Sequence, residues 1–178
     1  MKKVFWGLIF TYISINLSSI DIIPDFIGYL LIFFGMRELS VSKTLEKGWT
    51  LLASTAIAFL AWLPFDLGGD LGSVIETLLS CAHMATQIWV SWMVVLAVKE
   101  LEEKSGIALN SAALQKRWKL VTILAVVSLL VAILTAVLEV EALALVAVGA
   151  AAVCVIAAII FIIDFHKSRK LMEAHKQA

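Results

Sequence analysis

Polar side chains recur at helical spacing within an otherwise apolar stretch of the chain. Separations of four, three, four and four residues place Glu76, Ser80, His83, Gln87 and Ser91 on one helix face. Ionisable groups within a membrane commonly mark ion or proton routes, and His83 is the only histidine within an apolar run. We therefore predict that this face turns toward the protein interior and lines a ligand or ion path. The alternative is a neutral histidine that is hydrogen-bonded between helices.

A second candidate lies in the segment "SSIDIIPDFIGYLL", residues 18–31, where two aspartates flank a proline. Proline is tolerated in the first turn of a helix, so Asp21 is predicted to be the N-cap and Asp25 to lie one turn later. On a helix, Asp25 would stack against Tyr29 at i+4. A carboxylate held by a phenol could bind a cation or a proton. The alternative is a capped, tightly turned hairpin with a structural role alone.

The apolar stretch before this turn is unusually polar. Steps of three and four residues define two faces, one with Thr11, Ser14 and Ser18 and the other with Tyr12, Asn16 and Ser19. Such side chains usually join membrane helices by hydrogen bonds. Helix packing and a substrate path both remain open, and Asn16 is included in the predicted path.

The composition indicates which elements hold these residues. The chain has 178 residues, of which 62% are hydrophobic and 16% charged, with a mean hydropathy of +1.00. Soluble domains are roughly 45–50% apolar and about 25% charged. The sequence therefore predicts an integral membrane protein, and because lipid leaves backbone groups unsatisfied, an all-α one.

Charged residues divide the chain into apolar runs, most of which approach the roughly 20 residues that a membrane helix needs. We predict one membrane domain over residues 1–178, a six-transmembrane-helix bundle built of three hairpins. The expected spans are 4–20, 22–39, 48–65, 74–98, 119–138 and 142–163, with a cytoplasmic loop at 99–118 and a cytoplasmic tail at 164–178.

The charges are strongly sided under this six-span interpretation. All 14 lysines and arginines fall on the side that holds both termini. The opposite side holds only acids, namely Asp21, Asp25, Asp66, Asp70, Glu76, Glu139 and Glu141. The positive-inside rule then predicts cytoplasmic N and C termini and an acidic extracytoplasmic mouth.

The stretch "INLSSIDIIPDFIGYLLIFFGMREL" resembles the first hairpin of a family of small, uncharacterised polytopic membrane proteins of Gram-positive bacteria, which has an Asp-Ile-x-Pro-Asp-x-x-Gly-Tyr turn. The resemblance covers about residues 1–40 and implies a bacterial plasma membrane. "DIIPDFIGYL" is also similar to the Asp-x-Ile-Pro-Asp-x-Ile-Pro turn of YkvA-type domains, but Gly28 and Tyr29 replace the expected proline. Neither resemblance implies an activity.

Three classes of function follow from these features. The first is a transporter, channel or membrane ligand-binding subunit for a cation or small molecule. The second is a non-transporting partner or scaffold within a membrane complex or homo-oligomer, and the third, least supported, is an intramembrane enzyme. The chain has no HExxH, CxxC or Walker-type motif, so we predict no metal, cofactor or catalytic residues, and no nucleic-acid partner.

Overall fold

The computed structural model describes the backbone of residues 1–12, 16–17, 20–21, 24–39, 41–62, 69–138 and 141–175. Side chains are described for these residues except 16–17, 20–21, 42, 62, 69–71, 73, 76, 136–137 and 141–144. The elements in chain order are α1 (Lys2–Tyr12), β1 (Asn16–Leu17), β2 (Ile20–Asp21), α2 (Asp25–Glu38), α3 (Ser42–Leu45), α4 (Gly48–Trp62), α5 (Gly69–Ser105), α6 (Ser111–Leu138) and α7 (Glu141–His175).

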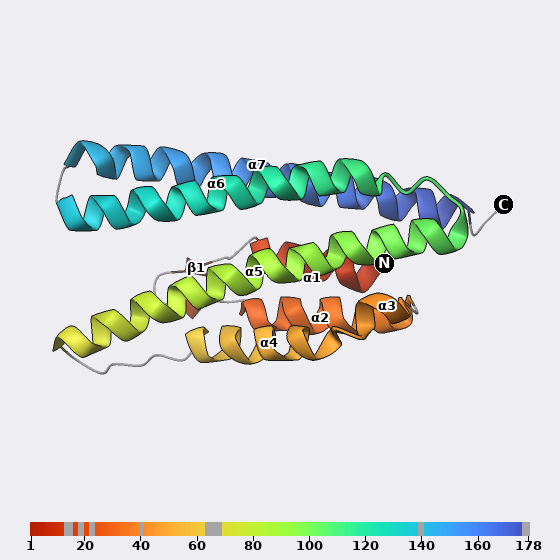
Figure 1. Ribbon diagram of the computed structural model, residues 1–178, viewed down its shortest axis with the longest axis horizontal. Coiled ribbons are helices and arrows are strands. Elements are labelled where there is room, and N and C mark those ends of the chain that lie inside the picture. The colour runs from red at the N-terminus through yellow and green to blue at the C-terminus, as the bar shows by residue number, and fades with distance from the viewer. Residues whose placement is uncertain are drawn as a thin grey trace.

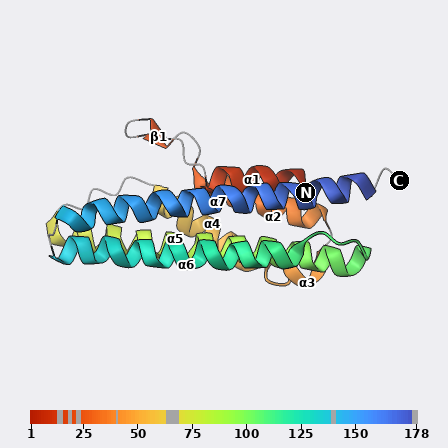
Figure 2. The same cartoon turned by 90° about the horizontal axis from the view of Figure 1, so that it is seen from above.

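The helices form an elongated bundle in which each packs against its neighbour along the chain (Figure 1). Helix α1 packs on α2, α2 on α4, α4 on α5, α5 on α6 and α6 on α7, and a contact between α1 and α7 closes the ring. Figure 2, a view from above, shows α6 and α7 running alongside each other over most of their length. The all-α class predicted from composition is confirmed at this level.

Among the described residues, three helical segments are by length and composition apolar enough to cross a membrane, namely Thr77–Ser105, Ser111–Thr135 and Leu145–His175. Helices α1 and α2 have 11 and 14 residues, so they are only about 17 and 21 Å long at 1.5 Å per residue, short of about 30 Å of hydrocarbon. Helix α4 contributes a shorter apolar segment, Gly48–Ala61. The number of spans therefore stays a prediction beyond these three.

The first predicted span, 4–20, is wrong as a continuous helix. Helix α1 ends at Tyr12, and an antiparallel pair of two-residue strands follows, with Asn16 opposite Asp21 and Leu17 opposite Ile20. Serine and asparagine side chains compete for backbone hydrogen bonds, and "SINLSS" supplies several of them. Asn16 belongs to β1 rather than to a helix, whereas Ser14, Ser18 and Ser19 of the predicted polar faces lie outside the described residues.

The predicted cytoplasmic loop and tail are largely helical. Helix α5 continues to Ser105 and α6 begins at Ser111, so only residues 106–110 of the predicted loop 99–118 lie outside helices. Helix α7 likewise extends to His175 through the predicted tail. The predicted spans ended where polar residues begin, at 98 and 163. The helices continue beyond these positions because their backbone hydrogen bonds do not depend on apolar side chains.

Close approach of α1 and α2 depends on glycine. A Cβ atom added at Gly28 would lie 2.6 Å from Thr11 Oγ1 and 2.8 Å from the carbonyl oxygen of Gly7. A Cβ atom at Gly7 would lie 2.6 Å from both the Gly28 carbonyl oxygen and Ile32 Cγ1. Reciprocal contacts of this kind let two helix backbones touch, as small residues do in membrane helix pairs. The two short helices thus pack as one hairpin.

Helix α3 is held by a carboxylate from α5. Glu100 accepts hydrogen bonds from the backbone nitrogens of Lys43 and Thr44, at 3.1 and 2.9 Å, and from Thr44 Oγ1 at 2.9 Å. The Lys104 ammonium lies 2.8 Å from the same carboxylate. Because unpaired N–H groups at a helix start need acceptors, Glu100 serves as a distant cap.

Substituting Glu100 with alanine is expected to lower the free energy of unfolding by about 1–3 kcal/mol, since buried donors on α3 lose their acceptor. Denaturation in detergent micelles, followed by tryptophan fluorescence, measures the change. Glu103→Ala, on the same helix with an exposed side chain, is the matched control and should stay within about 0.5 kcal/mol of the parent. Equal effects of the two substitutions would contradict the capping role.

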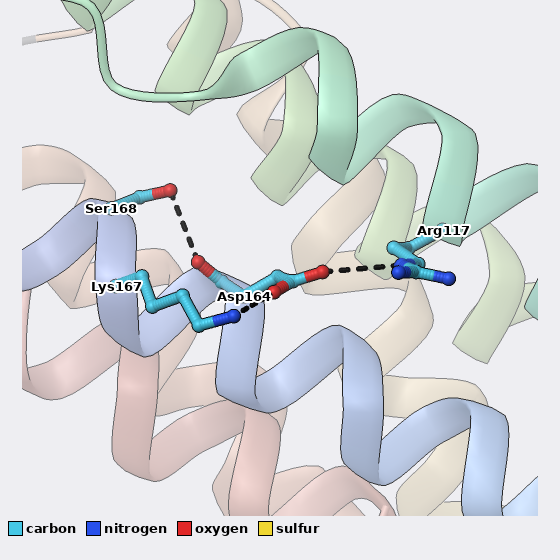
Figure 3. Close-up of polar contacts among 4 residues, drawn as sticks. All are labelled: Arg117, Asp164, Lys167 and Ser168. Atoms are coloured by element: carbon cyan, nitrogen blue, oxygen red, sulfur yellow. Dashed lines mark hydrogen bonds and ion pairs between the residues drawn. The ribbon is translucent and has the colours of Figure 1, made fainter.

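A second buried carboxylate, that of Asp164, joins α6 to α7 (Figure 3). Asp164 Oδ2 lies 3.2 Å from Arg117 Nε, and Asp164 Oδ1 lies 2.8 Å from Lys167 Nζ. Ser168 Oγ donates to the backbone oxygen of Asp164 at 3.2 Å. Both oxygens of the carboxylate are thus paired, which offsets the cost of burying it.

Candidate functional site

The candidate site begins where α2 starts. Pro24 is buried and occupies the N-cap position in an extended conformation, with φ −60° and ψ 135° and no side-chain cap. Asp25 follows as the first helical residue. The prediction that Asp21 caps this helix is wrong, because the backbone of Asp21 pairs with Asn16 in the strands and precedes the N-cap by three residues. The fixed φ of proline, rather than an aspartate side chain, sets the helix start.

Asp25 meets His83 of α5 across the bundle. Asp25 Oδ2 lies 2.9 Å from His83 Nε2, so a protonated Nε2 donates to the carboxylate. The side chain of Asp25 is 11% exposed and that of His83 is 28% exposed. The other carboxylate oxygen, Asp25 Oδ1, is buried and has no hydrogen-bond partner within the described part of the chain. This carboxylate therefore retains a free acceptor.

Tyr29 supports the pair differently from the sequence prediction. Its fully buried ring packs edge-on against the His83 ring, with 6.5 Å between centroids and an interplanar angle of 86°. Among the described side chains, no hydrogen bond joins the Tyr29 hydroxyl to Asp25. The carboxylate is therefore held by the imidazole rather than by the phenol, and the phenol ring positions the imidazole.

A chain of hydrogen bonds fixes α1 against α5 beside the pair. Ser91 Oγ donates to the carbonyl oxygen of Gln87 at 2.6 Å, so the Tyr12 hydroxyl, also 2.6 Å from Ser91 Oγ, must donate to it. Gln87 Nε2 donates to the carbonyl oxygen of Thr11 at 2.9 Å. The carbonyl groups in the last turn of a helix lack helical partners, and that of Thr11 finds one in Gln87 of α5.

An open polar cavity of about 270 Å³ lies beside these side chains, where α1, α2 and α5 meet. Its lining residues are Thr11, Tyr12, Asp25, Ser80, His83, Met84 and Gln87. We call this space the polar cavity. Within the lining, Asp25 and His83 provide the carboxylate and the imidazole, so the cavity has the chemistry to accept a proton or a hydrated or organic cation.

The structure brings together four of the sequence candidates, because Asp25, Ser80, His83 and Gln87 all line the polar cavity. Tyr29 packs behind His83. The remaining candidates are Asn16, Asp21 and Glu76, and the side chains of these three lie outside the described residues. Their predicted part in the path stays a prediction.

The sequence analysis placed Thr11 and Tyr12 on polar helix faces for which helix packing and a substrate path both stayed open, and it did not single out Met84. Thr11 and Tyr12 close the cavity from α1, and Met84 forms part of its lining. The spacing of Thr11 and Tyr12 relative to the later polar residues of the same segment pointed to helix packing. Their proximity to His83 depends on the contact between α1 and α5, which no local pattern encodes.

Within the described residues, no group of three or more His, Cys, Asp or Glu side chains comes together as a metal site would require. The Asp25–His83 pair alone offers two ligands, whereas stable protein sites for transition metals usually supply three or four.

No protein-family model matches the chain, and no curated protein or solved structure matches it either.

Proposed function

We propose that this chain is a small polytopic protein of the bacterial plasma membrane that binds a cation or small molecule in the polar cavity, as a transporter, a channel or a ligand-binding subunit. The observation that carries the proposal is the contact between Asp25 and His83, from two different helices, in a cavity that also touches α1. An ionisable residue within an apolar helix is by default a candidate for an ion or proton pathway, and here two such residues contact each other.

Six spans are consistent with the helix lengths if α1 and α2 extend only partway across the bilayer. Non-helical backbone at membrane depth is tolerated where it is covered by protein or lines a water-filled cavity. The polar cavity lies at this position, beside the last residue of α1, Tyr12, and the first of α2, Asp25. Water in the cavity would thus provide hydrogen-bond partners for the backbone groups at the end of α1 and the start of α2.

A cytoplasmic location for both termini is supported by the distribution of basic residues. The helix ends that carry lysine and arginine gather toward one end of the bundle, together with the N-terminus and the end of α7 (Figure 1). That is the arrangement that the positive-inside rule requires of an N-in, C-in protein. The bacterial plasma membrane as its location, and the acidic extracytoplasmic mouth, rest on the sequence alone.

One observation favours the second candidate function, a partner or scaffold subunit. On α7, Gly149 and Ala152 are exposed three residues apart on one helix face, and no described atom lies within 4 Å of a Cβ built at Gly149. Small residues on an unpaired helix face suit close packing with another membrane helix. In that case, the hydrogen bonds of Gln87 and Tyr12 would serve only to hold the bundle together.

The function is tested by the thermal stability of the purified protein in detergent, measured with ammonium, alkali-metal and divalent cations and with small metabolites. A ligand at 100 times its dissociation constant stabilises the folded state by about 2.7 kcal/mol and raises the melting temperature. We expect at least one cation to do so, and Asp25→Asn and His83→Ala to abolish the shift.

Glu103→Gln removes an exposed carboxylate outside the cavity and is the control, which should keep the full shift. If no cation or metabolite stabilises the parent, and the two site variants are merely less stable, the ligand-binding proposal fails and the scaffold remains. A shift that survives in both site variants would place the ligand elsewhere.

A further inference from the structure

A second cavity, of about 250 Å³, adjoins the polar cavity. The two share Tyr12, Met84 and Gln87 in their linings, so they meet along one wall formed by α1 and α5. Beyond that wall the second cavity runs between α5 and the α6–α7 hairpin. Its further lining includes Val121, Ala125, Ala151, Cys154, Val155 and Ala158, and we call it the apolar cavity.

The two cavities differ in what they can bind. The apolar cavity is lined mainly by aliphatic side chains, with Ser128 and the shared Tyr12 and Gln87 as its polar members apart from the Cys154 thiol. The polar cavity holds the carboxylate of Asp25, whose Oδ1 is buried and unpartnered within the described part of the chain. Among the described residues that line either space, none is lysine or arginine.

A buried carboxylate oxygen with no donor costs free energy until a donor or positive charge reaches it. His83 already occupies the other oxygen, Oδ2. A ligand that completes the site must therefore present a hydrogen-bond donor to this carboxylate, and a cationic donor forms the stronger, charge-assisted bond. An anionic ligand would instead face the carboxylate with no lysine or arginine in the described lining to pair with it.

Size adds a second condition. Pockets for drug-sized organic molecules are about 300–1,000 Å³, and neither cavity reaches that range by itself, whereas the two joined do. An inorganic ion or a small ammonium compound would fill only the polar cavity and leave the apolar lining uncovered. Burial of an apolar body against that lining would add affinity in proportion to the area removed from water.

We infer that the two cavities form one binding site for an amphipathic organic cation, such as a protonated primary amine with an aliphatic or aromatic body. The ammonium group pairs with the Asp25 carboxylate, and the apolar body lies in the space between α5 and the α6–α7 hairpin. This inference rests on the proposed function and specifies its ligand class.

Four probes test it by thermal shift on the full chain in lipid nanodiscs. Phenylbutylamine carries the cationic head and the apolar body, methylammonium carries the head alone, and phenylbutanol and phenylbutyrate carry the same body with neutral and anionic heads. We expect phenylbutylamine to bind on the order of 100-fold more tightly than methylammonium. Both other phenyl compounds should bind at least about tenfold more weakly than the amine.

Two variants separate the head from the body. Asp25→Asn should weaken phenylbutylamine binding and leave phenylbutanol unchanged. Ala125→Leu fills the apolar cavity, so it should weaken phenylbutylamine and leave methylammonium unchanged. Ala132→Leu, at an exposed position two turns further along the same helix and outside the lining of the apolar cavity, is the matched control and should bind phenylbutylamine as the parent does.

The outcomes distinguish this inference from the proposed function. Equal binding of methylammonium and phenylbutylamine, both lost in Asp25→Asn, would overturn the inference and leave the proposed function intact. Equal binding of all three phenyl compounds would overturn the cation requirement. Phenylbutylamine binding that Ala125→Leu does not change would exclude the apolar cavity, and failure of every probe to bind the parent would overturn the inference.

Discussion

Replacing His83 with alanine is expected to destabilise the protein by about 1–3 kcal/mol, because the buried carboxylate of Asp25 then has no partner on either oxygen. Adding Asp25→Asn should recover part of this loss of stability, because it removes the negative charge that His83 had been paired with. The double variant should therefore be more stable than His83→Ala alone, with a coupling energy of about 0.5–3 kcal/mol between the two positions.

The double-mutant cycle is measured by denaturation of the four proteins in detergent micelles, with tryptophan fluorescence as the signal. No ligand is added in this experiment, so the coupling energy concerns only the contact between Asp25 and His83. Losses that add to within about 0.3–0.5 kcal/mol would show that the two side chains act independently, and the contact would then have no energetic part in the site.

Gly28→Val should disrupt the α1–α2 hairpin and the polar cavity together. The new Cβ would meet Thr11 Oγ1 at 2.6 Å and the Gly7 carbonyl oxygen at 2.8 Å, both on α1, so the backbones must separate. Overpacking of this kind costs about 1–3 kcal/mol. Because Asp25 lies three residues earlier on α2 and Thr11 lines the cavity, any ligand shift seen with the parent should also be lost.

Gly149→Val is the matched control, as no described atom lies within 4 Å of a Cβ built there. Valine has a slightly higher helix propensity than glycine, so this variant should be as stable as the parent or slightly more so. Denaturation midpoints of both variants check the prediction. A hairpin that accepts valine at position 28 with no loss would mean that the close approach of α1 and α2 is not needed.

The sequence predicted the polar face of α5 because helical spacing is local. Ser80, His83 and Gln87 fall on one side whatever the rest of the chain does, and all three line the polar cavity. Asp25 could be singled out in the same way, as an acid at the edge of an apolar run. The pairing of Asp25 with His83 could not be predicted, because the contact joins α2 to α5, two helices that are far apart in the sequence.

Two other features were beyond sequence reasoning for different reasons. Helix α1 ends at Tyr12 although the apolar run continues, because the serine and asparagine side chains that follow compete for backbone hydrogen bonds. A prediction from the length of the apolar run does not take this competition into account. The capping of α3 by Glu100 joins residues 56 and 57 positions apart. The predicted cytoplasmic loop 99–118 therefore included Glu100, although its carboxylate is buried in the bundle.

The shortness of α1 and α2 has a consequence for biosynthesis. These helices precede α5 in the chain and leave the ribosome before it. Neither is long enough to cross the hydrocarbon alone, and the close contact at their glycines forms only when both are present. The three segments with spanning length all follow later in the chain. We therefore expect the N-terminal hairpin to wait at the membrane surface and to reach its final depth only after α5 has been inserted to receive it.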